Sequence, residues 1–540
     1  MAVSIFAIGA VTSLLQFVPR LRMPLSVVFM QFVFSFLFMI TMRCSIRIFS
    51  EFFKYQEKRY GDRIMVIGAG EAARMLLQEI RNASGQDAGT VCCLIDDNPL
   101  KIGKYLDGIR IVGNRDSIPD MVKRFHITQI ILAMPSAPQK AQRDILQICN
   151  STGCRVRKLP SLYQLVDGTV SLRHVRDVQI EDLLGRDTIS LDLAPLHALL
   201  HQKVVLVTGG GGSIGSELCR QIAHHKPKQL IIVDIYENNA YDIQQELRRA
   251  YGTSLDLQVE IASVRDKGQI EAIFSFYHPE LVFHAAAHKH VPLMEHNPIE
   301  AIKNNIFGTY HVVRAAEKYG VQKFVMISTD KAVNPTNFMG ATKRFCEMIL
   351  QSRYESKTEF CCVRFGNVLG SNGSVIPLFK QQIANGGPIT ITDKRIIRYF
   401  MTIPEAVQLV LAAGAMAKQG QIFVLDMGEP VKILDLAENL IRLSGLEPYA
   451  DIDIQEIGLR PGEKLYEELL ISSNTLSTTD NAKIFVEQQN HIDPDQILSA
   501  LEAFDTAVTD CASNAELVAL LRKYVPTYVD PETFNASNSQ

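Results

Sequence analysis

The sequence predicts an α/β protein in which two doubly wound parallel-sheet domains follow a transmembrane helical hairpin. Two nearly uncharged apolar runs occupy the first 42 residues. Short apolar strands then alternate with helical stretches in two successive parts of the chain. Each part opens on a strand followed by a glycine-rich turn, which is typical of Rossmann-like sheets. At 540 residues the chain is also too long for one hydrophobic core.

The apolar runs, residues 1–18 and 25–42, are each about long enough to cross a hydrocarbon layer of ~30 Å. Only residues 19–24 separate them, so we expect residues 1–60 to form a hairpin anchor in a lipid bilayer. A buried apolar helical pair is the alternative. The heavier basic flank follows the second run and predicts that the rest of the chain lies in the cytoplasm. Its cationic residues are Arg43, Arg47, Lys54, Lys58, Arg59 and Arg63.

The composition argues against two other classes of protein. The formal net charge of -3 gives no polycationic signature, so we expect no nucleic-acid partner. The ten cysteines show no CxxC spacing, which predicts buried free thiols rather than a disulfide or zinc scaffold. Free thiols fit a reducing cytosol.

Residues 61–180 predict the first parallel-sheet domain. Residues 63–67 form an apolar strand, and Gly68-Ala69-Gly70 follows as a glycine turn. Such a turn alone is weak evidence for a nucleotide. Asp96 or Asp97, after the next strand, could accept a hydrogen bond from a ribose. Nucleotide binding and a structural or regulatory role both stay open, and residues 181–202 are expected to connect this domain to the next.

Residues 203–480 predict the second and larger domain, and its cofactor signal is strong. A strand at residues 203–208 ends at Thr208 and leads into Gly209-x-x-Gly212-Ser213-Ile214-Gly215. Glycines there allow backbone N–H groups to approach a pyrophosphate at the start of the following helix. The next strand ends at Asp234, where a carboxylate would bind both ribose hydroxyls and repel a 2′-phosphate. The sequence therefore predicts NAD as the cofactor.

Later strands of this domain end at further candidate residues. Ser263 and Val264 follow the third strand, and Ala285-Ala286-Ala287 follow the fourth, where small side chains let the chain pass close to a cofactor. Lys289, His290 and Glu295 come next, where ligands collect at the strand ends. His288 and His290 lack a third metal ligand in register, so we expect no metal. A buried amide at Asn304-Asn305 would brace the active-site strand, and a helix-surface role is the alternative.

The candidate catalytic groups follow the apolar run of residues 324–327. Thr329, Asp330 and Lys331 supply a hydroxyl, an acid and an amine at the end of a strand. Met339 and Lys343 follow at the start of the next helix. Asn367 and the arginines Arg398 and Arg460 are expected to hold a diphosphate, because a guanidinium matches phosphate oxygens. A surface ion pair is the alternative for each arginine. Glu463 is expected to accept hydrogen bonds from ribose hydroxyls.

These residues resemble a known family. The glycine turn, Asp234, the alanine run and the hydroxyl-to-lysine spacing resemble the extended short-chain dehydrogenase/reductases. Four further motifs resemble the membrane-bound nucleotide-sugar 4,6-dehydratases of bacterial polysaccharide and glycan synthesis, over nearly the whole chain. They are Ser328-Thr329-Asp330-Lys331-Ala332, Met339-Gly340-Ala341-Thr342-Lys343-Arg344, the stretch 364–371 and Arg460-Pro461-Gly462-Glu463-Lys464.

The resemblance implies an activity. UDP-N-acetylglucosamine would be oxidised at C4 by NAD, lose water across C5–C6 and regain the hydride at C6, giving a 2-acetamido-2,6-dideoxy-4-keto sugar nucleotide. By resemblance Asp330 is the acid and Lys331 the base, which requires a depressed pKa for Lys331 and a protonated Asp330. The reverse assignment stays open. Thr329 would bind the 4-hydroxyl and Lys343 the nicotinamide ribose.

Met339 is a departure from the superfamily, which usually carries tyrosine four residues before the helix lysine. Neither Tyr310 nor Tyr399 has that spacing. Large membrane-bound members share this methionine and retain the configuration at C5, so the resemblance implies the retaining subgroup. The base for the C4 hydroxyl stays open between Asp330, Lys343 and water.

The resemblance also sets the expected surroundings of the enzyme. It implies a bacterial inner-membrane protein, cytoplasmic catalytic domains, a homo-oligomer and more membrane helices than the two predicted here. Residues 481–540 are expected to be a peripheral tail. Two other functions stay open: a nucleotide-sugar C4 epimerase, which needs no acid–base pair for dehydration, and a non-catalytic NAD-sensing membrane scaffold.

Overall fold

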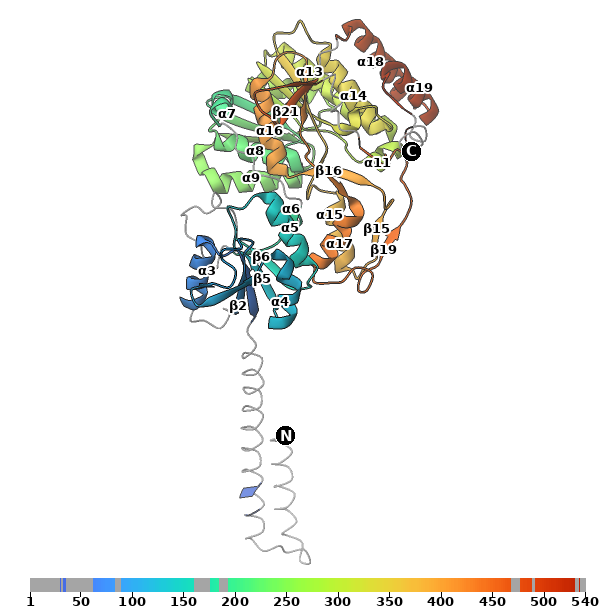
Figure 1. Ribbon diagram of the computed structural model, residues 1–540. Helices are drawn as coiled ribbons and strands as arrows, with labels where there is room; N and C mark the ends of the chain where they lie inside the picture. The colour runs from blue at the N-terminus through green and yellow to red at the C-terminus, as the bar shows by residue number, and fades with distance from the viewer. Residues whose placement is uncertain are drawn as a thin grey trace, which may run out of the picture. The chain divides into compact units, whose positions relative to one another are not determined.

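The computed structural model describes residues 62–82, 89–159, 175–183, 193–467, 476–487 and 491–529, together with Met30, Val33, Phe34 and Phe534 (Figure 1). The expected hairpin over residues 1–60 lies almost wholly outside the described residues. Among those described, no helix has the length and apolar character needed to cross a membrane. The chain divides into two compact units, residues 1–136 with 154–177, and residues 137–153 with 178–540.

The first unit is built on a seven-stranded sheet of order β3-β4-β2-β1-β5-β6-β7. Its central strands pair in parallel, because β-α-β connections return each strand in the same direction, and only the edge pairs β3·β4 and β6·β7 are antiparallel. The strands are β1 (Arg63–Ile67), β2 (Thr90–Ile95), β3 (Tyr105–Leu106), β4 (Ile109–Gly113), β5 (Gln129–Leu132), β6 (Arg155–Lys158) and β7 (Arg176–Asp177). Its helices are α3 (Glu71–Asn82) and α4 (Ile118–Phe125).

The boundary of this unit differs from the expected domain 61–180. Helix α5 (Gln139–Asn150) belongs to the second unit, where it packs with α6 (Ile180–Leu183) and α17 (Ile433–Leu443). Asn150 Nδ2 lies 3.3 Å from Asn439 Oδ1 of α17. Sequence periodicity predicts that this helix exists, but it does not predict which core receives its apolar face.

The second unit contains a nine-stranded sheet of order β10-β9-β8-β11-β12-β13-β17-β21-β20. The first seven strands are parallel, and β21 and β20 close the sheet antiparallel. Strand order reverses on either side of β8, as in a doubly wound dinucleotide-binding fold. The strands are β8 (Val204–Thr208), β9 (Gln229–Asp234), β10 (Leu257–Ile261), β11 (Leu281–His284), β12 (Lys323–Thr329), β13 (Glu359–Phe365), β17 (Gln421–Leu425), β20 (Leu476–Thr478) and β21 (Ile484–Glu487).

Alternate residues of these strands enter two separate cores, one on each face of the sheet. Leu206 packs in one core and its neighbours Val205 and Val207 in the other. Because both faces are covered, the strands read as continuous apolar runs rather than alternating ones. One core is completed by α10 (Lys267–Tyr277), α13 (Gly308–Lys318) and α14 (Phe338–Gln351), and the other by α7 (Leu193–Leu200), α8 (Ser213–His224), α9 (Glu237–Tyr251) and α16 (Ile403–Met416).

Residues 481–540 are not the peripheral tail that the sequence suggested. Strand β21 joins the main sheet, and α18 (Pro494–Thr509) and α19 (Asn514–Tyr524) pack on α14. Phe504 is fully buried, with its ring centroid 5.2 Å from that of Phe345. The two helices, drawn dark red in Figure 1, therefore form an outer layer that covers α14.

A smaller subdomain lies beyond the carboxyl ends of the parallel strands. It holds a three-stranded sheet of β14 (Asn367–Val368), β16 (Ile397–Met401) and β18 (Pro430–Lys432), and a two-stranded sheet of β15 (Ile389–Ile391) and β19 (Ile454–Glu456). Helices α15 (Val375–Ala384) and α17 cover these sheets. In a doubly wound fold, ligands bind beyond the carboxyl ends of the strands, where this subdomain begins.

Candidate functional site

A cavity of about 750 Å³ lies between the carboxyl ends of the parallel strands and the smaller subdomain. Most of the residues that the sequence analysis selected line it: Gly209, Gly212, Ser213, Ile214, Gly215, Ala285, Lys289, Thr329, Lys331, Met339, Lys343, Asn367, Arg398, Arg460 and Glu463. Residues from six separate stretches of chain thus meet at one site. The selected residues outside its lining are Thr208, Asp234, Ser263, Val264, Ala286 and Asp330.

The glycine turn closes tightly under the start of α8. Gly209 has φ +66°, and a Cβ there would lie 2.7 Å from Ala286 N. A Cβ on Gly215 would collide with Gly209 O. The Asp234 carboxylate accepts hydrogen bonds from Gly211 N at 2.8 Å and Tyr236 N at 2.9 Å, so it also fixes the shape of the turn. These contacts give a rigid backbone cradle of the kind that binds a pyrophosphate.

Three of the expected cofactor contacts do not reach the cavity through their side chains. The Thr208 hydroxyl is fully buried, 2.7 Å from His284 Nδ1. Val264 is buried in the core beneath α10 and α13. Ser263 Oγ accepts a hydrogen bond from Arg265 N. The side chains of these three residues therefore lie outside the lining of the cavity.

The candidate catalytic groups stand where β12 ends. Thr329 closes the strand opposite Phe365 of β13, and residues 330–332 form one turn of 3-10 helix. Thr329 Oγ1 donates to Asp330 Oδ1 at 2.8 Å, and Lys331 Nζ lies 3.1 Å from the same oxygen. The hydroxyl, the acid and the amine therefore share one hydrogen-bonded centre, with Thr329 and Lys331 at the cavity wall and Asp330 behind them.

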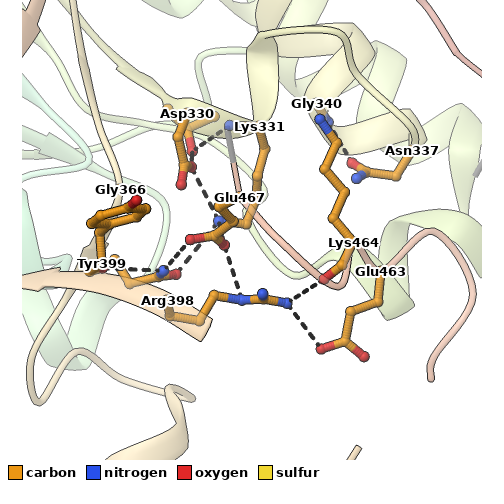
Figure 2. A network of polar contacts seen from close by, with 12 residues as sticks. Asp330, Lys331, Asn337, Gly340, Gly366, Arg398, Tyr399, Glu463, Lys464 and Glu467 are labelled. Carbon is orange, nitrogen blue, oxygen red and sulfur yellow. Dashed lines mark hydrogen bonds and ion pairs between the residues drawn. The ribbon is translucent and has the colours of Figure 1, made fainter. Parts of the chain in front are cut away.

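Glu467 is a member of this centre that the sequence analysis missed. Figure 2 shows it between Lys331 and Arg398. Its Oε1 lies 2.8 Å from Lys331 Nζ and 3.1 Å from Arg398 Nε, and its Oε2 accepts from Asn367 Nδ2 at 2.8 Å. Its side chain is only 4% exposed. In the sequence Glu467 lies in an acidic run shortly after Glu463, so local pattern alone does not separate it from a surface carboxylate.

Arg398, which the sequence predicts to hold a diphosphate, lines the cavity and is itself held by protein groups. Its Nε pairs with Glu467, one terminal nitrogen donates to Ile397 O and Leu465 O, and the other to Lys464 O and Glu463 Oε1. Four hydrogen bonds and one ion pair therefore hold the guanidinium within the protein. Arg398 holds the segment 463–467 against β16 and fixes the position of Glu467 (Figure 2).

The resemblance requires a protonated Asp330 and a neutral Lys331, but the surroundings of both groups favour their charged forms. Burial raises the pKa of Asp330, but Lys331 and the hydrogen bond from Thr329 outweigh it, and the pKa falls below its ordinary value. Burial lowers the pKa of Lys331, but Asp330 and Glu467 outweigh it and raise the pKa above its ordinary value. Burial and the nearby Asp330 carboxylate raise the pKa of Glu467. Without substrate, Asp330 is therefore ionised and Lys331 is charged.

Lys343 and Met339 reach the cavity from the first turns of α14. The Asn337 side chain accepts from Gly340 N at 2.7 Å and caps this helix. Lys343 is 5% exposed, and its ammonium donates to no acceptor among the described residues, so it is available to a ligand. Met339 packs with Met294 and Ala301 and presents no titratable group.

Asn305 is the buried bracing amide that the sequence analysis expected, and it does not lie on a helix surface. Its side-chain oxygen accepts from His288 N at 2.8 Å, and its amide donates to His288 O and to Thr342 Oγ1. It lies on a π-helical segment, Ile302–Phe307, and is 1% exposed. The alanine–histidine loop and α14 are thereby held at a fixed separation.

Two further cations of the cavity lack a carboxylate partner among the described residues. Lys289 Nζ donates to Asn372 O at 2.8 Å, and burial lowers the pKa of this lysine. Arg460 lies at the cavity wall, and its backbone N–H donates to Glu463. Both positions suit an anionic ligand, because neither cation is neutralised by the protein.

The comparisons with known proteins agree with this geometry. A family model described as polysaccharide biosynthesis protein matches residues 205–489, and one described as CoA-binding domain matches residues 1–160. The capsular polysaccharide biosynthesis protein CapD of Staphylococcus aureus is 50% identical over 75% of this chain and 68% of its own length. The inverting UDP-N-acetylglucosamine 4,6-dehydratase of Campylobacter jejuni is 35% identical over 51% of this chain and 79% of its own. The UDP-glucose 4-epimerase of Rickettsia canadensis is 36% identical over 52% and 80%.

The doubly wound sheet, the glycine turn and the lysine of α14 define an extended short-chain dehydrogenase/reductase. Within that class, the family model covers more than half of the chain. The chain belongs to the polysaccharide biosynthesis protein family.

Proposed function

We propose that this protein is an NAD-dependent UDP-N-acetylglucosamine 4,6-dehydratase that retains the configuration at C5. The observation that carries the proposal is the hydrogen-bonded centre of Thr329, Asp330 and Lys331 at the wall of the cavity. A dehydration needs one group to protonate the departing 6-hydroxyl and one to remove the C5 proton. A C4 epimerase needs neither group, so this centre favours the dehydratase.

The cradle under α8 fits a dinucleotide. A side chain at Gly209 or Gly215 would overlap the neighbouring backbone, so the turn stays open to a ligand. Asp234 lies at the end of the next strand. Lys343 would contact the nicotinamide ribose. When bound, NAD would supply the chemistry of taking a hydride from sugar C4 and returning it to C6.

The geometry supports a base for the C4 hydroxyl in place of the missing tyrosine. Thr329 Oγ1 donates to the ionised Asp330, so it can take the O4 proton while passing its own proton to Asp330 Oδ1. This transfer leaves Asp330 protonated. Asp330 can then protonate the departing 6-hydroxyl, which reconciles its low resting pKa with its role as the acid.

Lys331 would remove the C5 proton and later return a proton to the same carbon. Because one amine serves both steps from one side of the sugar, the configuration at C5 would be kept. The relative whose name states inversion is 35% identical. The resemblance assigns retention to the members that carry methionine at the position of Met339, and this part of the proposal rests on that residue.

Lys289 and Arg460 would hold the diphosphate, and Asn367 and Glu463 would orient the sugar nucleotide. We further propose that residues 1–60 anchor the chain in the bacterial inner membrane with the catalytic unit in the cytoplasm. The two apolar runs and the basic residues that follow them support this location.

Mass spectrometry of the nucleotide sugar tests the proposed reaction. The full chain, purified in detergent, is incubated with NAD and UDP-N-acetylglucosamine, and the Asp330→Asn variant is treated in parallel. We expect a product lighter by one water from the wild type and unchanged substrate from the variant. A product of unchanged mass with the galacto configuration would identify an epimerase and contradict the proposal.

A further inference from the structure

The buried carboxylate of Glu467 is not needed to bind substrate, because it lies outside the cavity lining. It belongs to the segment after Glu463 and reaches the catalytic centre from behind. It contacts groups of that centre and its scaffold: Lys331 Nζ at 2.8 Å, Arg398 Nε at 3.1 Å and Asn367 Nδ2 at 2.8 Å. Its carboxyl also interacts with that of Asp330. A charged group with so little exposure needs a function or a strong compensation.

The proposed reaction poses a proton problem at Lys331. Its ammonium lies 3.1 Å from Asp330 Oδ1 and 2.8 Å from Glu467 Oε1, so it is charged before substrate binds. A charged amine cannot remove the C5 proton. The first proton must therefore leave Lys331 without passing to Asp330, which is to receive the O4 proton.

The contacts of Lys331 leave one acceptor for that proton. The third neighbour, Asn367 Oδ1 at 3.4 Å, belongs to a neutral amide that does not take up a proton near neutral pH. Glu467 is the closest of the three. It is also the group of this centre that best tolerates a proton, because neutralising it leaves Arg398 with four protein acceptors.

We propose that Glu467 takes and stores the proton of Lys331 in each turnover, as a positioning residue that acts through the lysine. The inference rests on the proposed dehydration. The O4 proton reaches Asp330 through Thr329, and the Lys331 proton moves to Glu467. Neutral Lys331 then takes the C5 proton while Asp330 gives its proton to the departing hydroxyl, which leaves as water. Lys331 returns a proton to C5 and regains the stored one from Glu467, so every group ends as it began.

The surroundings of Glu467 support a carboxyl that changes its charge. Asp330 and Lys331 face it from the 3-10 turn, and Arg398 and Tyr399 face it from β16. Burial and the Asp330 carboxylate both disfavour the ionised form of Glu467, whereas Lys331 and Arg398 favour it. Their sum raises the pKa of Glu467 above its ordinary value, which is the direction that favours uptake of a proton.

Three variants of the full chain test the inference. Glu467→Gln keeps the size of the side chain and an acceptor for Lys331 but cannot store a proton, and Glu467→Asp keeps the carboxylate. Glu280→Gln is the control, because Glu280 pairs with Lys203 at 2.6 Å at the amino ends of strands β11 and β8, the ends opposite to the catalytic centre. Steady-state rates with NAD and UDP-N-acetylglucosamine are measured from pH 6 to pH 9, and single-turnover mixtures are quenched with borodeuteride to trap 4-keto sugars.

We expect kcat of Glu467→Gln to fall roughly 10–100-fold with little change in KM, because a base is impaired and binding is not. Its kcat should rise about tenfold per pH unit, since solvent must now deprotonate Lys331, whereas the wild type stays flat over the same interval. The 4-keto-6-hydroxy sugar should accumulate in this variant alone. Glu467→Asp should recover the flat profile, and Glu280→Gln should match the wild type.

Parallel pH profiles for Glu467→Gln and the wild type, with no trapped intermediate, would overturn the proton store and leave Glu467 a structural residue. Failure of Glu467→Asp to flatten the profile would overturn it as well. If the wild type itself removes no water from UDP-N-acetylglucosamine, the proposed function fails and this inference fails with it. The two failures are therefore distinguished by the wild-type reaction alone.

Discussion

At the level of single residues, the Thr329 hydroxyl at the end of β12 lies between the cavity and the ionised Asp330 carboxylate. Thr329 lines the cavity and donates to Asp330, whereas Asp330 lies behind it. The proposed relay thus requires the hydroxyl and not only the acid. The hydroxyl is required because Met339 lines the cavity where the superfamily usually has tyrosine, and a thioether cannot accept the O4 proton.

Replacing this hydroxyl tests the relay. We expect Thr329→Val to lower kcat by roughly 10²–10⁴-fold, the usual contribution of one positioned proton-transfer group. Thr329→Ser, which keeps the hydroxyl, should lose much less. Steady-state kinetics measure the difference, and equal losses in the two variants would show that shape rather than proton transfer matters at this position.

Asp330→Asn separates the enzyme from a non-catalytic sensor. The amide keeps the size of the acid but can neither receive the O4 proton nor protonate the leaving hydroxyl. We expect turnover to fall by at least about 10³-fold while NAD still binds, because Asp330 lies outside the cavity lining. NAD binding is measured by calorimetry, because the chain has no Trp whose fluorescence could report it. Unchanged turnover would contradict the assignment.

At the scale of elements, the strand ends are held together by a buried ion pair beneath the catalytic centre. Glu347 of α14 accepts from Arg364 of β13 through both carboxylate oxygens at 2.6 Å, and from Ser328 of β12 at 2.6 Å. Both charged side chains are at most 2% exposed. The pair therefore ties α14, β12 and β13 at the residue just before Thr329.

This pair predicts an acid-sensitive stability. Burial raises the pKa of Glu347, but Arg364 and its hydrogen bonds outweigh it and lower the pKa to about 2. A depressed carboxyl pKa stabilises the fold above the unfolded-state value, and that stability is lost as pH falls toward the folded value. Denaturant unfolding at neutral pH should show Glu347→Gln less stable by about 3–5 kcal/mol, because the buried Arg364 loses both hydrogen bonds to Glu347 and keeps its ion pair with Glu487 at 2.9 Å.

The difference between Glu347→Gln and the wild type should shrink as pH falls from about 5 toward 2, since the wild-type carboxyl then protonates. A difference that stays constant over this interval would contradict the ion-pair account. Arg220→Gln offers a surface comparison, because its partner Glu246 is half exposed and such pairs contribute about 0–1 kcal/mol.

The glycine turn gives a second prediction at this scale. A methyl group on Gly215 would meet the Gly209 carbonyl, so Gly215→Ala must displace the turn or the start of α8. We expect NAD affinity to fall by more than about tenfold, because the backbone N–H groups lose their alignment. Gly268→Ala is the control, because Gly268 is an exposed glycine of α10 whose Cβ would meet only Asp266 Oδ1, at an ordinary contact distance of 3.4 Å. Equal affinities for NAD would argue against the cradle.

The sequence predicts a strand, turn or residue cluster well where neighbouring residues alone determine its structure. The strand–turn–helix around Gly209–Gly215 and the cluster at Thr329–Lys331 each lie within a few consecutive residues. The contacts of Glu467 and of Arg398 could not be predicted, because they join segments more than 65 residues apart in the chain. The orientation of Thr208 depends on His284, a partner on another strand.

At the scale of the whole molecule, the C-terminal region is part of the catalytic unit. Helices α18 and α19 supply apolar side chains to the core that also receives α14. Their sequence is amphipathic and polar enough to read as a tail, and only the tertiary structure shows the apolar face against α14. The helix that carries Met339 and Lys343 is thereby covered on its outer side.

Truncation of one side chain measures this contribution. We expect Phe504→Ala to destabilise the protein by about 3–5 kcal/mol, as large-to-small changes in cores do. Leu498→Ala on the same helix should cost little, because Leu498 is 42% exposed. Chemical denaturation compares them, and a small effect of Phe504→Ala would mean that the helices are loosely attached.

Proton NMR in deuterated water follows the proposed retaining dehydration at C5 and C6 of the sugar. The full chain is incubated with NAD and UDP-N-acetylglucosamine, and the product is also prepared in ordinary water. We predict a C6 methyl singlet in deuterated water, because solvent deuterium enters C5, and a doublet in ordinary water. In ordinary water an Overhauser contact between H3 and H5 should show that both remain on one face of the sugar. A methyl signal without that contact would contradict retention, and the absence of any C6 methyl would contradict the dehydratase itself.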